Sequence, residues 1–247
     1  WLMKVLKLDD VNYLHHRNLN TPGAPFVRGI LDDFRISVRV DNAQVLENLP
    51  EGAFITVSNH PFGAVDGIML IDLFASRRED YKVMVNLILN HIRGMRPNFI
   101  AVDPLASNDP EKRAITMHGI KEAMIHVKRG HPLGFFPAGA MSKLNWKLQL
   151  EDRPWQPSVM RLIQQLNVPV VPVFFRGRNS WLFNILGVVC WQLPTVRLPS
   201  EVFSHHDTTY HISVGDIITP EEQKKYTDLE SFTQMLRSRT YSLRSRK

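Results

Sequence analysis

The sequence contains a single cysteine, Cys190, so no intrachain disulfide can form, and one thiol suits a reducing compartment. It has no low-complexity run and no internal repeat. No signal peptide is visible, although the chain begins with Trp1 rather than with methionine. No apolar run reaches the roughly 18 residues that a membrane-spanning helix needs. The nearest, Trp181–Leu193, is interrupted by Asn184 and Gln192. These absences exclude a disulfide scaffold and a repeat protein.

What remains is the composition of an ordinary globular chain, with 44% hydrophobic and 22% charged residues among 247. A chain of this length is expected to form one domain with a full core. Strand-like and helix-like patterns alternate along most of it. The alternation predicts an α/β fold, a single layered domain with a mixed, mostly parallel sheet flanked by helices. In such sheets the working residues follow the carboxyl ends of strands.

Apolar periodicity and turn residues give the expected elements. Strands are expected at 34–40, 53–58, 82–85, 99–102, 133–136, 168–175 and 210–214. Helices are expected at 2–14, 66–74, 109–129 and 159–166, and from 219 into the C-terminus. Pro169 and Pro172 leave open whether the apolar stretch 168–175 is a central strand or an irregular edge strand.

Positive charge is concentrated at the C-terminus. The segment 237–247 carries five of the 30 basic residues and no acid, which leaves 25 basic against 24 acidic residues elsewhere. A basic end favours an anionic partner such as lipid headgroups, nucleic acid or an acidic protein. A solvated helix end explains the same residues equally well, so both interpretations stay open.

A histidine and an aspartate follow the predicted strand 53–58. A neutral imidazole at His60 can accept a proton near neutral pH. A carboxylate at Asp66 can hold the required tautomer and stabilise the imidazolium that forms. No serine stands where His60 would activate it, so the activated hydroxyl is expected to belong to a substrate. On spacing alone, a plain strand-end histidine and a helix N-cap aspartate are the commoner interpretation.

A turn of small residues follows the predicted strand 133–136. Its members are Pro137, Ala138, Gly139 and Ala140. Small residues allow close backbone approach to a ligand, and free N–H groups in such a turn can bind an anion. Plain turns have the same composition, so the segment alone does not identify a site.

Taken in order, four segments resemble the motifs of the glycerolipid acyltransferase superfamily, which includes the bacterial lysophosphatidate acyltransferases. Asn59-His60 with Asp66 resembles its Asn-His-x-x-x-x-Asp motif. The sequences NFIAVD, FPAGA and VPVVPV, which begin at residues 98, 136 and 168, are similar to its second, third and fourth motifs. The resemblance covers roughly residues 30–218. It implies one acyltransferase domain over residues 1–247, with a basic C-terminal helix at about 220–247.

The resemblance also implies a reaction without a cofactor. The family's histidine deprotonates an acceptor hydroxyl, which attacks an acyl thioester on acyl carrier protein or coenzyme A, while the aspartate orients the histidine. These roles are carried to His60 and Asp66, with Asn59, Gly63 and Ser142 expected to line the substrate site beside the small-residue turn. The implied partners are the thioester donor, a lyso-lipid acceptor and an anionic membrane surface, with no nucleic acid. The implied location is peripheral, on the cytoplasmic face of the inner membrane.

Three departures from the family pattern are informative. Five residues, not four, separate His60 from Asp66, and Gly63 among them can absorb the extra residue as a bulge. Asp103 stands where the second motif usually ends in a phosphate-binding arginine. Ala138 replaces the glutamate of the third motif. The first motif is therefore kept while two acceptor-binding motifs are altered.

This pattern is similar to the branch that O-acylates lyso-ornithine or lyso-glycine lipids, some of whose members carry a hemolysin label. The segment 174–180 also resembles that branch. Within it Arg176 and Arg178 are suited to an acceptor carboxylate, because the guanidinium fork matches a carboxylate, although surface arginines would look the same. The alternatives are a lysophosphatidate acyltransferase and a non-catalytic membrane-binding or lytic protein.

Other candidate residues favour structural interpretations. Cys190 lies in an apolar run and is expected to be packed. His205, His206 and His211 have no second ligand cluster, so no metal site is expected. Trp181–Trp191 fits a buried helix or a lipid-facing patch equally well.

Overall fold

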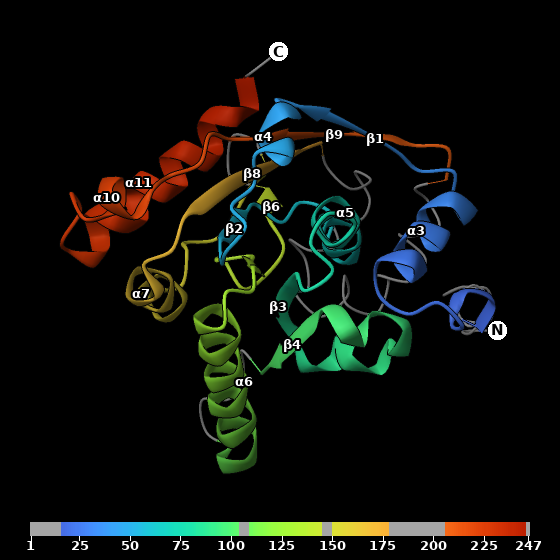
Figure 1. The fold of residues 1–247 in the computed structure, drawn as a ribbon, viewed down its shortest axis with the longest axis horizontal. Coiled ribbons are helices and arrows are strands. Elements are labelled where there is room, and N and C mark those ends of the chain that lie inside the picture. Colours follow the sequence, from blue (N-terminus) through green and yellow to red (C-terminus); the bar gives the residue numbers. More distant parts are fainter. Residues whose placement is uncertain (1–15, 104–108, 145–149, 178–205, 246–247) are drawn as a thin grey trace.

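A seven-stranded sheet forms the centre of the molecule (Figure 1). The computed structural model describes residues 16–103, 109–144, 150–177 and 206–245. In sheet order the strands are β1 (Ser37–Asp41), β9 (Thr209–Val214), β8 (Val170–Arg176), β2 (Ile55–Ser58), β5 (Leu133–Phe135), β3 (Lys82–Asn86) and β4 (Phe99–Val102). All neighbouring pairs are parallel except β8 and β9. The predicted mixed, mostly parallel sheet is thereby confirmed. A separate antiparallel pair joins β6 (Lys143–Leu144) and β7 (Leu150–Glu151).

Helices cover both faces of the sheet (Figure 1). The α-helices are α3 (Ala24–Asp33), α4 (Gln44–Glu47), α5 (Ala64–Ala75), α6 (Pro110–Lys128), α7 (Pro157–Leu166), α10 (Pro220–Gln223) and α11 (Leu229–Ser242). The 3₁₀ helices are η1 (Leu87–His91), η2 (Arg93–Asn98) and η3 (Leu243–Ser245). Helices α3 and α5 pack on one face, and α6, α7 and α11 contribute to the core on the other.

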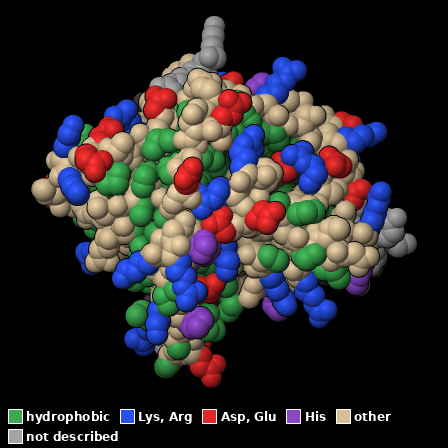
Figure 2. Space-filling model, viewed as in Figure 1, with side chains coloured by type: hydrophobic (Ala, Val, Ile, Leu, Met, Phe, Trp, Pro, Cys, Tyr) green, Lys and Arg blue, Asp and Glu red, His purple; other side chains and the backbone are tan. Residues whose placement is uncertain are grey.

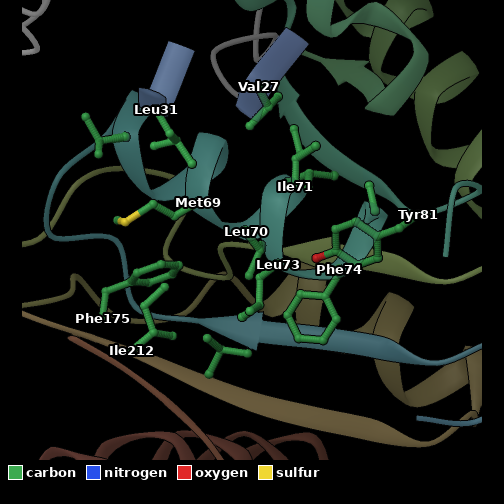
Figure 3. Packing of buried hydrophobic residues seen from close by; sticks show 14 of the residues in the cluster. Val27, Leu31, Met69, Leu70, Ile71, Leu73, Phe74, Tyr81, Phe175 and Ile212 are labelled. Carbon is green, nitrogen blue, oxygen red and sulfur yellow. The ribbon is translucent and has the colours of Figure 1, made fainter. Parts of the chain in front are cut away.

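Helix α5 is the most deeply buried helix on its face, because its sequence is apolar on nearly every side. Nine of its twelve residues are buried. Figure 3 shows Leu70 and Ile71 of α5 among Val27 and Leu31 of α3, with Phe175 of β8 on the sheet side. This packing fixes the helix, and therefore the residues at its N-terminus.

Two expectations about the elements need correction, and one alternative that the sequence left open is decided. The strand predicted at 34–40 begins only at Ser37, because Phe34 is the C-cap of the unpredicted helix α3. The helix predicted from Thr219 is two helices: Thr219 caps the four-residue α10, and Asp228 caps α11 separately. Of the two alternatives for the stretch 168–175, the central strand is the one observed, as β8 (Val170–Arg176) between β9 and β2. Pro172 is tolerated there because pairing with β9 starts one residue later, at Val173. The helix predicted at 2–14 lies outside the described residues.

Strand β2 lies fourth in the seven-stranded order and is buried at every residue. Its carboxyl end leads straight into the segment that contains His60. Among the described residues, no helix is both long enough and apolar enough to cross a bilayer.

Candidate active site

The structure brings His60 and Asp66 into direct contact. His60 Nδ1 lies 3.0 Å from Asp66 Oδ2. His60 follows the carboxyl end of β2, and Asp66 lies in the first turn of α5. Gly63 is the N-cap of that helix and has a φ of 69°, a conformation that glycine adopts without strain. This backbone reversal accommodates the five intervening residues.

One oxygen of Asp66 accepts three hydrogen bonds. In addition to His60 Nδ1, Asp66 Oδ2 accepts the backbone N–H groups of Phe62 (2.8 Å) and Gly63 (3.0 Å). The carboxyl is fully buried, whereas 19% of the His60 side chain is exposed. Burial raises the pKa of the Asp66 carboxyl above its ordinary value, while the hydrogen bond and charge of His60 act in the opposite direction. Asp66 is thus the third residue of α5 rather than its N-cap, and its side chain still satisfies the helix start.

The His60 ring is held between polar and aromatic neighbours. With Nδ1 facing Asp66, its Nε2 is the nitrogen left for a substrate. The ring of Phe136 lies beside it, with ring centroids 4.1 Å apart. Asn59, the residue before His60, is buried, and its side-chain amide makes two hydrogen bonds to the backbone of Phe175 in β8. Both neighbours restrict the histidine to one orientation.

A second buried carboxylate, Asp152, contacts the same segment. Asp152 Oδ1 accepts the backbone N–H of His60 at 3.2 Å and the hydroxyl of Ser142. Ser142 in turn donates its backbone N–H to the carbonyl of His60 at 2.9 Å. On the other side, the backbone N–H of Asp152 donates to the hydroxyl of Tyr241 in α11 at 3.0 Å. Asp152 was not predicted from the sequence, because a lone aspartate 92 residues from His60 matches no motif.

The small-residue turn lies close to this site but is largely packed. Pro137 and Ala138 are buried, and Ala138 belongs to the core formed with α7 and α11. Gly139 is exposed, but its N–H donates to the carbonyl of Phe136 at 2.9 Å, so that donor is used within the turn. Ala140 is partly buried. The expected anion cradle therefore does not include the N–H of Gly139.

Of the remaining predicted site residues, Asp103 follows a distant strand, whereas Arg176 ends the strand next to β2. Asp103 follows β4, three strands from β2, which corresponds to roughly 14 Å at the usual strand spacing. Its backbone exchanges two hydrogen bonds with the side chain of Thr116. Arg176 ends β8 and forms an ion pair with Asp41 at 2.9 Å. Arg178 lies outside the described residues, as do Cys190 and the segment Trp181–Trp191.

A hollow of about 130 Å³ lies next to the backbone segment of His60, although His60 itself is not part of its lining. Asn59 and Ser142 form part of its lining, together with Arg176 at the end of β8 and Tyr241 and Arg244 near the C-terminus. The side chain of Arg176 also donates to the carbonyl of Leu243 at 3.2 Å. The hollow therefore joins the His60 segment to the C-terminal helix.

The basic C-terminal segment is partly neutralised within the chain. Arg237 pairs with Glu151 at 2.9 Å, and Arg239 pairs with Glu222. Figure 2 shows basic and acidic side chains interspersed over the face in view. Of the other histidines, His206 packs against Phe34 and His211 is exposed on β9; His205 lies outside the described residues. No group of three or more potential metal ligands lies within the described part of the chain.

The family model described as Acyltransferase matches residues 1–246. The chain belongs to this acyltransferase family. A lyso-glycine lipid O-acyltransferase of Bacteroides thetaiotaomicron is 29% identical over 87% of this chain and 78% of its own length. A lyso-glycine lipid O-acyltransferase of Phocaeicola vulgatus is 24% identical over 98% of this chain and 86% of its own length.

The fold of this acyltransferase is similar to that of PlsC, the 1-acyl-sn-glycerophosphate acyltransferase of Thermotoga maritima, in its crystal structure. The TM-score is 0.57 at 14% sequence identity, with 100% of this chain and 96% of that chain covered. The family resemblance and the enzyme class that the motifs predicted are confirmed. The roles of individual residues stay predictions, supported by their geometry.

Proposed function

We propose that this acyltransferase transfers a fatty acyl group from a thioester to the hydroxyl of a lyso-amino-acid lipid, with a lyso-glycine lipid as the first candidate. The observation that carries the proposal is the His60–Asp66 contact of 3.0 Å at the carboxyl end of a central strand, in a chain that belongs to the acyltransferase family. The two relatives with lyso-glycine lipid in their names supply the acceptor class.

In the proposed reaction His60 acts as general base. Its Nε2 takes the proton of the acceptor hydroxyl while the hydroxyl oxygen attacks the thioester carbonyl. Asp66 Oδ2 accepts a hydrogen bond from the Nδ1–H group, which selects the tautomer and stabilises the imidazolium. When the tetrahedral intermediate collapses, the carbon–sulfur bond breaks and the sulfur leaves with the proton from His60. The products are an ester and a free thiol, and no cofactor enters the balance.

The acceptor class also agrees with the charges around the site. A phosphate acceptor needs fixed positive charge, because a doubly charged group is costly to remove from water when it is unpaired. The motif position that usually supplies an arginine is Asp103, which follows a strand three places away from β2. A carboxylate carries less charge, so a single arginine can balance it.

The proposed partners are an acyl carrier protein or coenzyme A thioester as donor, the lyso-lipid as acceptor, and an anionic membrane surface from which the acceptor is taken. The proposed location is peripheral, on the cytoplasmic face of the inner membrane. The support is the lipid acceptor named in the relatives and the basic C-terminal segment.

The test is a competition between lyso-glycine lipid, lyso-ornithine lipid and lysophosphatidate, with acyl carrier protein thioester and coenzyme A thioester as donors in separate series. We expect a lyso-amino-acid lipid to be preferred. His60→Ala is expected to lower turnover by about 10²–10⁴, the usual contribution of a general base. His211→Ala is the matched control, because His211 is an exposed histidine of β9. A clear preference for lysophosphatidate would contradict the acceptor assignment, and an active His60→Ala would contradict the base.

A further inference from the structure

The hollow adjoins the His60 segment, through Asn59 and Ser142 in its lining, and is large enough for a small head group. Asn59 directly precedes His60, and Ser142 donates its backbone N–H to the His60 carbonyl at 2.9 Å. Both line the hollow, whose volume is about 130 Å³. An acceptor whose hydroxyl lies at His60 therefore has a cavity for its head group next to the same backbone segment.

The lining of the hollow is positively charged. It includes two arginines, Arg176 and Arg244, and no aspartate or glutamate. The charge of Arg176 is balanced by Asp41, which lies 2.9 Å away. Arg244 takes part in no ion pair with the described residues. Within the described structure, Arg244 is thus the lining cation that has no carboxylate partner.

Neighbouring groups hold the Arg244 side chain in place. Its guanidinium donates to the carbonyl of Leu150 at 2.8 Å. The guanidinium carbon lies 5.9 Å from the ring centroid of Phe174 and 6.0 Å from that of Tyr241, within the range of cation–π attraction. One hydrogen bond uses only part of a guanidinium with five N–H donors, so capacity for a ligand remains.

We propose that Arg244 binds the carboxylate of the acceptor's head group in this hollow and so selects acceptors that carry an acid. The proposal rests on the proposed function and adds the residue that reads the head group. It moves the acceptor's counter-charge from Arg176, which is already paired, to a residue of the C-terminal segment. The donor's pantetheine arm also carries an anionic group, a phosphate, so the experiment must separate acceptor from donor.

The experiment compares Arg244→Gln with Arg239→Gln. Arg239 lies in α11, just before the 3₁₀ turn that carries Arg244, and it pairs with Glu222 rather than lining the hollow. Each variant removes one positive charge from the same segment, so a general effect on membrane or lipid affinity is shared. The acceptors are lyso-glycine lipid and its uncharged N-methyl amide, and kcat/KM is measured for each, together with KM for the thioester donor.

For Arg244→Gln we expect kcat/KM for the acid to fall by about 10- to 100-fold, the usual effect of losing one charged hydrogen-bonding partner. The amide should be nearly unaffected, so the preference for the acid disappears. Arg239→Gln should keep that preference, and Arg244→Lys should keep part of it. Equal losses for acid and amide would overturn the proposal. A raised donor KM with the acid preference intact would place the anion on the donor and would also overturn it.

Binding gives the same comparison without catalysis. Titration calorimetry with a soluble N-acylglycine is expected to show weaker binding to Arg244→Gln than to the wild type, while Arg239→Gln binds normally. Circular dichroism checks that both variants are folded. Unchanged N-acylglycine binding in Arg244→Gln would overturn the proposal. Failure of the proposed function is seen separately, as a folded wild type that binds N-acylglycine but transfers no acyl group to lyso-glycine lipid.

Discussion

Asp152 is expected to act as a positioning residue for His60, and substitutions there can separate position from charge. The carboxylate contacts the backbone N–H of His60 and the hydroxyl of Ser142, and the backbone N–H of Asp152 donates to the hydroxyl of Tyr241 in α11. It is not placed to touch the reacting atoms. Its effect on the reaction should therefore pass through the location of the imidazole.

The two informative changes are Asp152→Ala and Asp152→Asn. Alanine leaves three donors, the His60 N–H, the Ser142 hydroxyl and the Trp155 indole N–H, without their acceptor. An unsatisfied donor costs about 1–3 kcal/mol when buried. The His60 and Ser142 groups are only partly buried, and the buried Trp155 bond is long at 3.4 Å, so a total of about 2–4 kcal/mol is expected. Domains are typically stable by about 5–15 kcal/mol, so the variant should stay folded. Asparagine keeps an oxygen at the Oδ1 position for His60 and Ser142 and loses the long bond from Trp155 to Oδ2, so it should cost about 1 kcal/mol.

The expected kinetic signatures differ in the same way. A displacement of about 1 Å at a catalytic group can cost about 10² in rate, so kcat of Asp152→Ala should fall by about that factor with little change in KM. Asp152→Asn should keep most of kcat.

The assay is steady-state thioester consumption, with the folded fraction of each variant measured by urea unfolding. The control is Asp72→Asn. Asp72 of α5 is also buried, and it pairs with Arg28 of α3. This control should lose stability without losing kcat per folded molecule. The reasoning is refuted if Asp152→Ala keeps wild-type kcat, or if Asp152→Asn is impaired as strongly as Asp152→Ala.

Two further predictions concern the dyad and the membrane. Asp66→Asn should lower kcat/KM by at least about 100-fold. Burial raises the pKa of Asp66, so the stability that this group contributes is complete below the ordinary value of 3.8 and is lost as pH rises through the folded pKa. The stability of Asp66→Asn relative to the wild type, measured by urea unfolding, should therefore increase with pH. A decrease with pH would contradict this prediction. For the basic segment, replacing Arg244, Arg246 and Lys247 by glutamine should weaken binding to anionic vesicles by about 1 kcal/mol per charge, and salt should weaken wild-type binding; equal binding to neutral and anionic vesicles would remove the segment from membrane attachment.

The elements that the sequence predicts well are those with a strong local signal. Helix α6 begins after the Asp109 cap and ends just before Gly130, and β4 has the predicted bounds. Helix α3 was missed because its first residues, after Gly23, include a proline and carry no capping side chain. The C-terminal helix was predicted as one piece because a single capping signal at Thr219 was extended across a second, at Asp228.

The same distinction between local and long-range signals applies to the site residues. His60 and Asp66 are six residues apart, so a local motif could identify them together. Asp152 and Arg244 reach the site only because β7 packs beside the C-terminal helix, where Arg237 and Arg244 donate to backbone carbonyls of Asp152 and Leu150. No pattern along the chain encodes that proximity. Site residues that are distant in sequence can therefore be identified only from the folded structure.

The contact of Asp66 also resolves an apparent choice between a structural and a functional role. The sequence offered a helix-capping aspartate or a partner for His60 as alternatives. In the structure the same oxygen, Oδ2, accepts the backbone N–H groups that begin α5 and the Nδ1 side of the imidazole. The backbone bonds hold the carboxylate in one position before any substrate arrives, so the histidine meets a preorganised acceptor. Because one atom serves both purposes, a variant at Asp66 changes the helix start and the imidazole together. Substitution at His60, which leaves both backbone bonds of Asp66 in place, is the cleaner probe of the reaction.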